Sequence, residues 1–166
     1  MSNESPICAA CGGACCKRCP GMYSPEDFGA PDRSAMRERI AAGIQAGRVQ
    51  IDWWEGDPRI SGFASVMAPM VRCLFPRAPV AGDDPLFSPS WGGLCALLTP
   101  RGCELTFAER PAACRLLEPY VIPLWACMQP PQGDKQVMCC EWVAYQDVLE
   151  SFECESDQAA EWWRFR

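Results

Sequence analysis

The sequence predicts a small, irregular single domain of the α+β class, built from short helices and short strands. The 166 residues are 49% apolar, which fits one hydrophobic core spanning residues 1–166. The 16 prolines and 13 glycines divide the chain into short pieces. The 13 cysteines offer sulfur ligands, and cysteine–metal coordination would staple a domain whose core is modest.

The clearest helix signal follows Asp32. Met36, Ile40 and Ile44 recur every four residues after this N-cap, and Gly47 stands where a helix would end. The pattern predicts a half-buried helix of about four turns.

Shorter helical elements are expected on both sides of the centre of the chain. Ser24 is placed to cap a turn that begins at Pro25, and a further helix is expected to begin near Pro111. A longer helix is predicted from Cys140 to about Phe152.

Two strands and a hairpin complete the predicted elements. Residues 49–54 and 70–75 are candidate strands, and alternate residues of the first would share one buried face. Residues 76–93 lack periodicity and predict a long loop, while residues 100–102 form a turn signal between two short strands.

Charge and hydropathy disfavour several classes of protein. The net charge of −6 lacks the basic excess of nucleic-acid-binding proteins. No run reaches the roughly 18 apolar residues of a membrane span, so no membrane partner is expected. The start of the chain, MSNESPIC, has no secretory signal, which predicts a cytoplasmic location.

Cysteines crowd one short segment. CAACGGACCKRC, from Cys8 to Cys19, holds five of the 13. Crowded thiolates repel one another and oxidise easily unless a cation neutralises them, and zinc and iron are suitable soft acceptors. Disulfides are uncommon in a reducing compartment, and there are no histidines, so any zinc would be bound mainly by sulfur.

The spacing in this segment also approaches a ferredoxin pattern. Cys8, Cys11, Cys15, Cys19 and Pro20 fall within one inserted residue of the bacterial C-x2-C-x2-C-x3-C-P run. Iron, as an iron–sulfur cluster, is therefore slightly preferred over zinc.

A second pattern covers more of the chain. CAACGGACC, GLCALL, RGCELTFAERPAACRLLEP and MCCEWVAYQDVLE, in this order, resemble the YkgJ-like cysteine-cluster family, the CxxCxxCC zinc- or iron-chelating domain. The element RP-x2-CR, from Arg110 to Arg115, distinguishes the combination. The resemblance spans residues 8–152.

The resemblance implies a set of eight thiolate ligands, which would serve one cluster and one ion, or two sites. Cys139 is an alternative to Cys140, and Cys19 is a further candidate. The implied ligands are Cys8, Cys11, Cys15, Cys16, Cys95, Cys103, Cys114 and Cys140.

Three further cysteines and two arginines also allow a structural role in place of a role at the metal site. Cys73, Cys127 and Cys154 are expected to be buried thiols. Arg110 and Arg115 would either donate hydrogen bonds to cluster sulfurs or pair with Glu109 or Glu118.

Three functions are compatible with these observations. The first is a metal-binding protein with an iron–sulfur cluster or iron, a redox or electron-transfer role and an unknown protein or redox partner. The second is a structural zinc-binding interaction module. The third is an accessory domain related to the flagellin lysine methylating proteins. No glycine-rich nucleotide loop follows a strand to bind a methyl donor, which argues against an enzyme, but enzymatic activity stays open.

Overall fold

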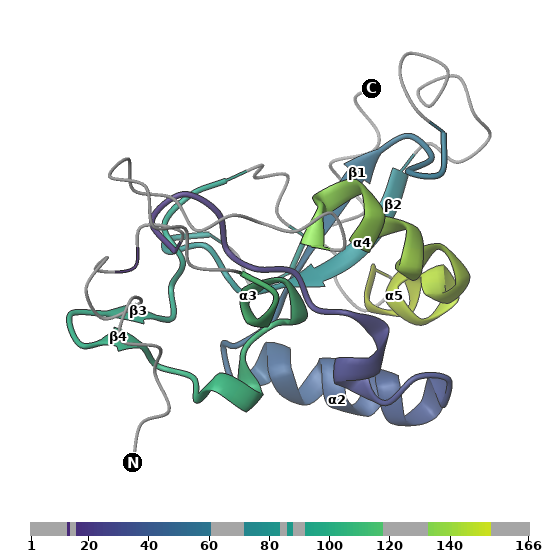
Figure 1. Cartoon of the computed structure of the whole chain (residues 1–166). Coiled ribbons are helices and arrows are strands. Elements are labelled where there is room, and N and C mark those ends of the chain that lie inside the picture. The colour runs from purple at the N-terminus through teal and green to yellow at the C-terminus, as the bar shows by residue number, and fades with distance from the viewer. Residues whose placement is uncertain are drawn as a thin grey trace.

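The computed structural model describes residues 13, 16–60, 72–83, 86–87, 92–117 and 133–153. In these residues short helices accompany two small antiparallel sheets, which confirms the α+β class. Figure 1 shows the small hairpin β3–β4 at one end and helices α4 and α5 at the other, beside the larger sheet. No described helix is long and apolar enough to cross a membrane.

The larger sheet pairs β1 (Gln50–Glu55) with β2 (Arg72–Arg77), and Ile51 lies opposite Pro76. Both strands were predicted, but β2 continues to Arg77, into the region predicted as loop. Proline cannot donate to a strand ladder and is confined to edges. Here the Pro76 carbonyl oxygen accepts from the Tyr23 N–H at 3.0 Å, and Arg77 forms an antiparallel bridge with Met22, so the end of β2 pairs with a distant part of the chain.

Helix α2 (Arg33–Gln45) forms where the sequence predicts it. Asp32 Oδ1 accepts from the backbone N–H groups of Ser34 and Ala35 at 3.0 and 3.1 Å. Met36 and Ile40 are fully buried, so the four-residue repeat marks the core-facing side of the helix.

The predicted helix over 140–152 is wrong at its start. Helix α4 (Lys135–Trp142) begins five residues earlier and runs through the 3-10 turn η5 (Val143–Tyr145) into α5 (Gln146–Glu153). Asp134 is the N-cap, and its Oδ1 accepts from the Gln136 N–H at 2.9 Å. The capping carboxylate therefore fixes the start, ahead of the apolar repeat.

The remaining short elements agree with the predicted turns. Ser24 precedes η1, Pro111 precedes α3 as its N-cap, and residues 100 and 101 connect β3 to β4. A capping box of Thr106 and Glu109 opens η3. The bounds are η1 (Pro25–Phe28), β3 (Leu98–Thr99), β4 (Gly102–Cys103), η3 (Phe107–Glu109) and α3 (Ala112–Arg115).

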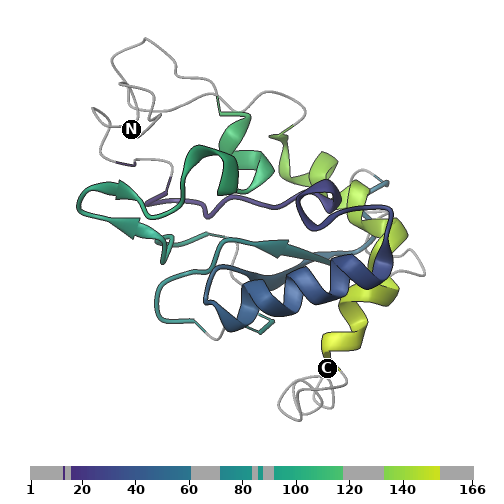
Figure 2. The ribbon, with the colours of Figure 1, turned by 90° about the horizontal axis from the view of Figure 1, so that it is seen from below.

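An extended stretch, residues 21–24, ties these elements together, and we call it the connecting segment. The Met22 carbonyl oxygen accepts from the Ala113 N–H at 3.0 Å, at the start of α3. The Tyr23 carbonyl oxygen accepts from Trp142 Nε1 at 2.8 Å, on α4. Figure 2 shows the segment running between α3 and the larger sheet.

Buried apolar side chains form two clusters. The large cluster joins the larger sheet to the helices, and Trp142 is its largest fully buried side chain. The small cluster has few members and contains cysteines: Ala78, Cys95, Leu97 and Leu105, with Cys16, Leu98 and Cys103 packed against it.

Candidate functional site

The predicted thiolate ligands divide by what the structure describes. Cys8, Cys11 and Cys15 lie outside the described residues, as do Cys127 and Cys154. The other five predicted ligands are described, namely Cys16, Cys95, Cys103, Cys114 and Cys140.

Cys16 and Cys95 are brought together although they are far apart in the sequence. The Cys95 N–H donates to the Cys16 carbonyl oxygen at 2.8 Å, and the Gly93 N–H donates to that of Arg18 at 3.1 Å. Cys95 is buried and Cys16 is half-buried. The end of the cysteine-rich segment therefore lies along the residues that precede β3.

Cys103 and Cys114 lie on the elements that follow. Cys103 is in β4 and packs with Cys16 against the small cluster. Cys114 is in α3, and a Cβ atom added at Gly21 would overlap its Sγ. Because Gly21 has no side chain, it leaves room for the Cys114 sulfur.

Tyr23 is an electrostatic neighbour of three predicted ligands. Burial raises the pKa of Tyr23 well above its ordinary value, and negative charge at Cys114, Asp27, Cys95 and Cys103 raises it further. Tyr23, in the connecting segment, is therefore within electrostatic range of all three cysteines, Cys95, Cys103 and Cys114.

Cys140 belongs to a different group of cysteines. Within the described part of the chain, none of its interactions involves Cys16, Cys95, Cys103 or Cys114; its charged neighbours are Asp57, Arg59 and Glu141. In the same region the Cys73 thiol donates to the Cys139 carbonyl oxygen at 3.5 Å.

The cysteines around Cys140 are poor sources of thiolate. Burial raises the pKa of Cys73 to about 12, with a further contribution from Cys140, and it also raises the pKa of Cys139. Both residues are fully buried, so the prediction of a buried thiol at Cys73 is confirmed.

The metal-ligating side chains that the structure describes do not by themselves form a site. Among the described residues there is no group of three or more cysteine, aspartate or glutamate side chains that could hold a metal ion. A centre near Cys16 would therefore need the cysteines that precede it, and the set of eight ligands stays a prediction.

The arginines of the RP-x2-CR element have structural partners. Arg115 Nη2 lies 2.6 Å from Asp27 Oδ1, and its Nη1 donates to the Arg110 carbonyl oxygen. Glu109, one of the predicted partners, pairs instead with Arg48 at 3.4 Å. Glu118, the other, lies outside the described residues.

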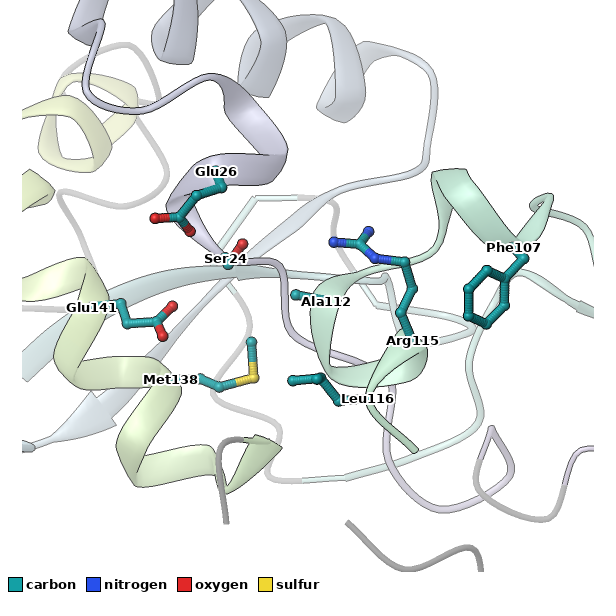
Figure 3. Close-up of a pocket in the computed structure, with 8 residues that line it drawn as sticks. All are labelled: Ser24, Glu26, Phe107, Ala112, Arg115, Leu116, Met138 and Glu141. Atoms are coloured by element: carbon teal, nitrogen blue, oxygen red, sulfur yellow. The ribbon is translucent and has the colours of Figure 1, made fainter. Parts of the chain in front are cut away.

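A pocket of about 380 Å³ lies between α3, α4 and η1, and sequence reasoning missed it. Its walls come from segments far apart in the chain, so no local pattern marks it. Figure 3 shows the lining side chains, which are Ser24, Glu26, Phe107, Ala112, Arg115, Leu116, Met138 and Glu141.

A buried ion pair inside the larger sheet was also missed. Asp52 Oδ2 lies 3.0 Å from Arg77 Nε, and the two side chains are 1% and 3% exposed. Burial raises the pKa of Asp52 to about 6, although Arg77 and the Trp53 N–H favour its charged form. The alternation in residues 49–54 suggested one buried face, but both faces of β1 are covered.

Known proteins do not identify the chain. No protein-family model, curated protein or solved structure matches it. The resemblance to the YkgJ-like family therefore remains a prediction from the sequence motifs.

Proposed function

We propose that this protein binds a metal through cysteine thiolates contributed by its cysteine-rich first segment and by Cys95, Cys103 and Cys114. One observation carries the proposal: the hydrogen bond from the Cys95 N–H to the Cys16 carbonyl oxygen, which holds the first segment against the later cysteines. Cys8, Cys11, Cys15 and Cys16 would supply the remaining sulfurs.

The side chains around these cysteines fit a thiolate-bound metal. Gly21 leaves room for the Cys114 sulfur, and Cys103 shares the small cluster with Cys95. Zinc and iron both accept sulfur ligands, and a bound cation would relieve the mutual repulsion of nearby thiolates. Cys140 is left out of this centre, since its described interactions are with a separate group of residues.

Iron, as an iron–sulfur cluster, is the preferred metal, with a redox or electron-transfer role toward a protein partner in the cytoplasm. The ferredoxin-like spacing of Cys8, Cys11, Cys15 and Cys19 supports this preference. A closed zinc site in an interaction module is the alternative, and an accessory domain of a methylating enzyme is the third candidate.

The test is metal and sulfide analysis of anaerobically purified protein, with its visible absorption spectrum. A brown protein that contains iron and sulfide supports the cluster; a colourless protein with stoichiometric zinc supports the structural alternative. Protein that contains neither metal would overturn metal binding itself.

Serine variants test the assignment of ligands. Replacing both Cys8 and Cys11 with serine should abolish stoichiometric metal and lower solubility. Cys73→Ser is the matched control and should keep its metal, because that thiol is buried with Cys139 in the large cluster. Full metal content in the double variant contradicts the assignment.

A further inference from the structure

The pocket between α3, α4 and η1 is lined by different side chains from the cysteine group. Adjacent residues of α3 serve the two places: Cys114 lies against Gly21, whereas Arg115 lines the pocket. The volume of about 380 Å³ admits a small organic group. What this pocket binds is therefore a separate question from metal binding.

Two acidic side chains dominate the charge of this pocket. Figure 3 shows the carboxylates of Glu26 and Glu141 directed toward one another across the space beside Ser24. Neither carboxylate has a hydrogen-bond or ion-pair partner among the residues that the structure describes. They come from η1 and α4, so the fold, not the local sequence, brings them together.

Arg115, the one cation among the described residues that line the pocket, is already paired. Arg115 binds the carboxylate of Asp27 at 2.6 Å and also donates to the Arg110 carbonyl oxygen. Asp27 is fixed in turn, since its Oδ2 accepts from the backbone N–H groups of Ser24 and Ala112 at 3.0 and 3.1 Å. With the charge of Arg115 balanced by Asp27, Glu26 and Glu141 leave the pocket negative.

Apart from Ser24, the rest of the described lining is apolar, and part of it is exposed. Met138 and Ala112 are buried, whereas Leu116 and Phe107 are 39% and 46% exposed. Large apolar side chains beside two carboxylates suit a ligand that has an apolar part and a cationic end.

We infer that this pocket binds a primary ammonium group carried on an unbranched apolar stem. The ammonium group has three N–H donors and one positive charge, which match the acceptors of Glu26 and Glu141. The stem would lie against Leu116 and Met138. A small aliphatic amine and a lysine side chain of another protein share this chemistry.

The experiment measures pentylammonium binding to the full-length, metal-loaded protein by calorimetry. Glu26→Gln and Glu141→Gln should each weaken binding roughly tenfold, because each removes a charged acceptor. Glu150→Gln, an exposed position in α5 away from the pocket, is the matched control and should bind as the parent protein does. Equal binding by the parent and the double Gln variant would overturn the inference.

The stem is tested with the length of the ligand. Affinity should rise roughly fourfold for each added methylene from ethyl- to pentylammonium, and less steeply in Leu116→Ala. Pentanol and pentanoate should bind more weakly than pentylammonium. Tighter binding of either one contradicts recognition of an ammonium group.

Two further measurements complete the design. Nα-acetyl-lysine amide tests the lysine source; its binding supports recognition of a protein side chain, binding of pentylammonium alone supports a small amine, and binding of neither overturns the inference. Metal content is measured in every variant. Loss of amine binding with metal retained separates this site from the proposed metal centre.

Discussion

Gly21 shows how the absence of one side chain bears on the proposed centre. Its neighbour across the fold is Cys114, and an added Cβ would overlap that sulfur while also approaching Pro111. The requirement for glycine at position 21 is therefore steric, because any larger residue would collide with the Cys114 sulfur.

We therefore expect Gly21→Ala to displace Cys114 and to lower the metal content of the purified protein. Gly43→Ala is the matched control, because its added methyl would overlap Val49 in the large cluster, away from the predicted ligands. It should retain its metal, whatever its effect on stability. Metal analysis of both variants provides the comparison, and equal metal content would contradict the placement of Cys114 at the centre.

The buried ion pair of Arg77 and Asp52 gives a second prediction for a single residue. A carboxylate buried without its cation is costly, so removal of one partner of a buried pair destabilises a protein by about 3–5 kcal/mol. Arg77→Met should show a loss of this order at pH 7. Arg48→Met removes an exposed pair with Glu109 and should cost only about 0–1 kcal/mol.

The sign of the pH dependence follows from the raised pKa of Asp52. Its ordinary value is 3.8 and its folded value is about 6, so the folded state binds the proton more tightly. The stabilisation that comes from this tighter proton binding is fully present below pH 3.8 and is lost as the pH rises through 6. Without Arg77 the pKa rises further, because that cation favours the charged carboxylate.

The penalty of Arg77→Met should therefore be larger at pH 7 than at pH 5. Urea unfolding of the variant and the parent at the two pH values measures it. A penalty that is the same at both, or that grows as the pH falls, contradicts the proposed protonation of Asp52.

At the scale of elements, one side chain joins α5 to the larger sheet. Gln146 Oε1 accepts from the Leu74 N–H at 2.8 Å, and its Nε2 donates to the Leu74 carbonyl oxygen at 2.9 Å. Nε2 also donates to the Trp142 carbonyl oxygen at 3.0 Å. The amide thus extends the hydrogen bonding of β2 in the manner of an adjacent strand.

Gln146→Leu should destabilise the protein by about 1–3 kcal/mol, because it leaves buried backbone groups of Leu74 without a partner. The Leu74 amide should also exchange faster with deuterium. Gln45→Leu, an exposed position at the end of α2, is the control and should change neither quantity appreciably. Unchanged exchange at Leu74 in Gln146→Leu would show that α5 is held by other contacts.

The predicted elements succeeded where the signal was local. The Asp32 cap and the four-residue repeat define α2, and both act within the helix itself. The start of α4 was predicted too late, because the apolar pattern begins after Asp134, the residue that caps the helix. Strand β2 was ended too early, because the interaction that accommodates Pro76 comes from the distant Tyr23.

The candidate sites divide in the same way. The cysteines were recognisable because their crowding and spacing are visible in the chain. The pocket was not, since Glu26 and Glu141 are neighbours only after η1 and α4 pack around the connecting segment. The grouping of Cys140 with Cys73 likewise depends on α4 packing against β2.

For the whole molecule, the division into two apolar clusters predicts uneven stability. The large cluster has many fully buried side chains, whereas the small cluster has only four buried members among the described residues. A core this small gains little from burial, so its order should depend on the proposed metal.

Removal of the metal by a chelator, under anaerobic and reducing conditions, should therefore open the small cluster first. The Leu98 and Glu104 amides, which donate to Cys95 and Leu97 carbonyl oxygens, should lose protection from hydrogen exchange, while the Met36 amide should stay protected. Exchange followed by mass spectrometry or NMR measures the difference. Equal loss in both clusters, or no loss in either, contradicts this dependence.

The connecting segment also limits how this chain can be dissected. Its backbone joins the cysteine-rich stretch to α3 and, through the Trp142 indole, to α4. A synthetic peptide copied from residues 8–19 would lack both anchors, and it would lack the sulfurs of Cys95, Cys103 and Cys114. We therefore expect that the cysteine-rich stretch does not bind metal in the same way as an isolated peptide. The proposed metal binding should require the whole folded chain.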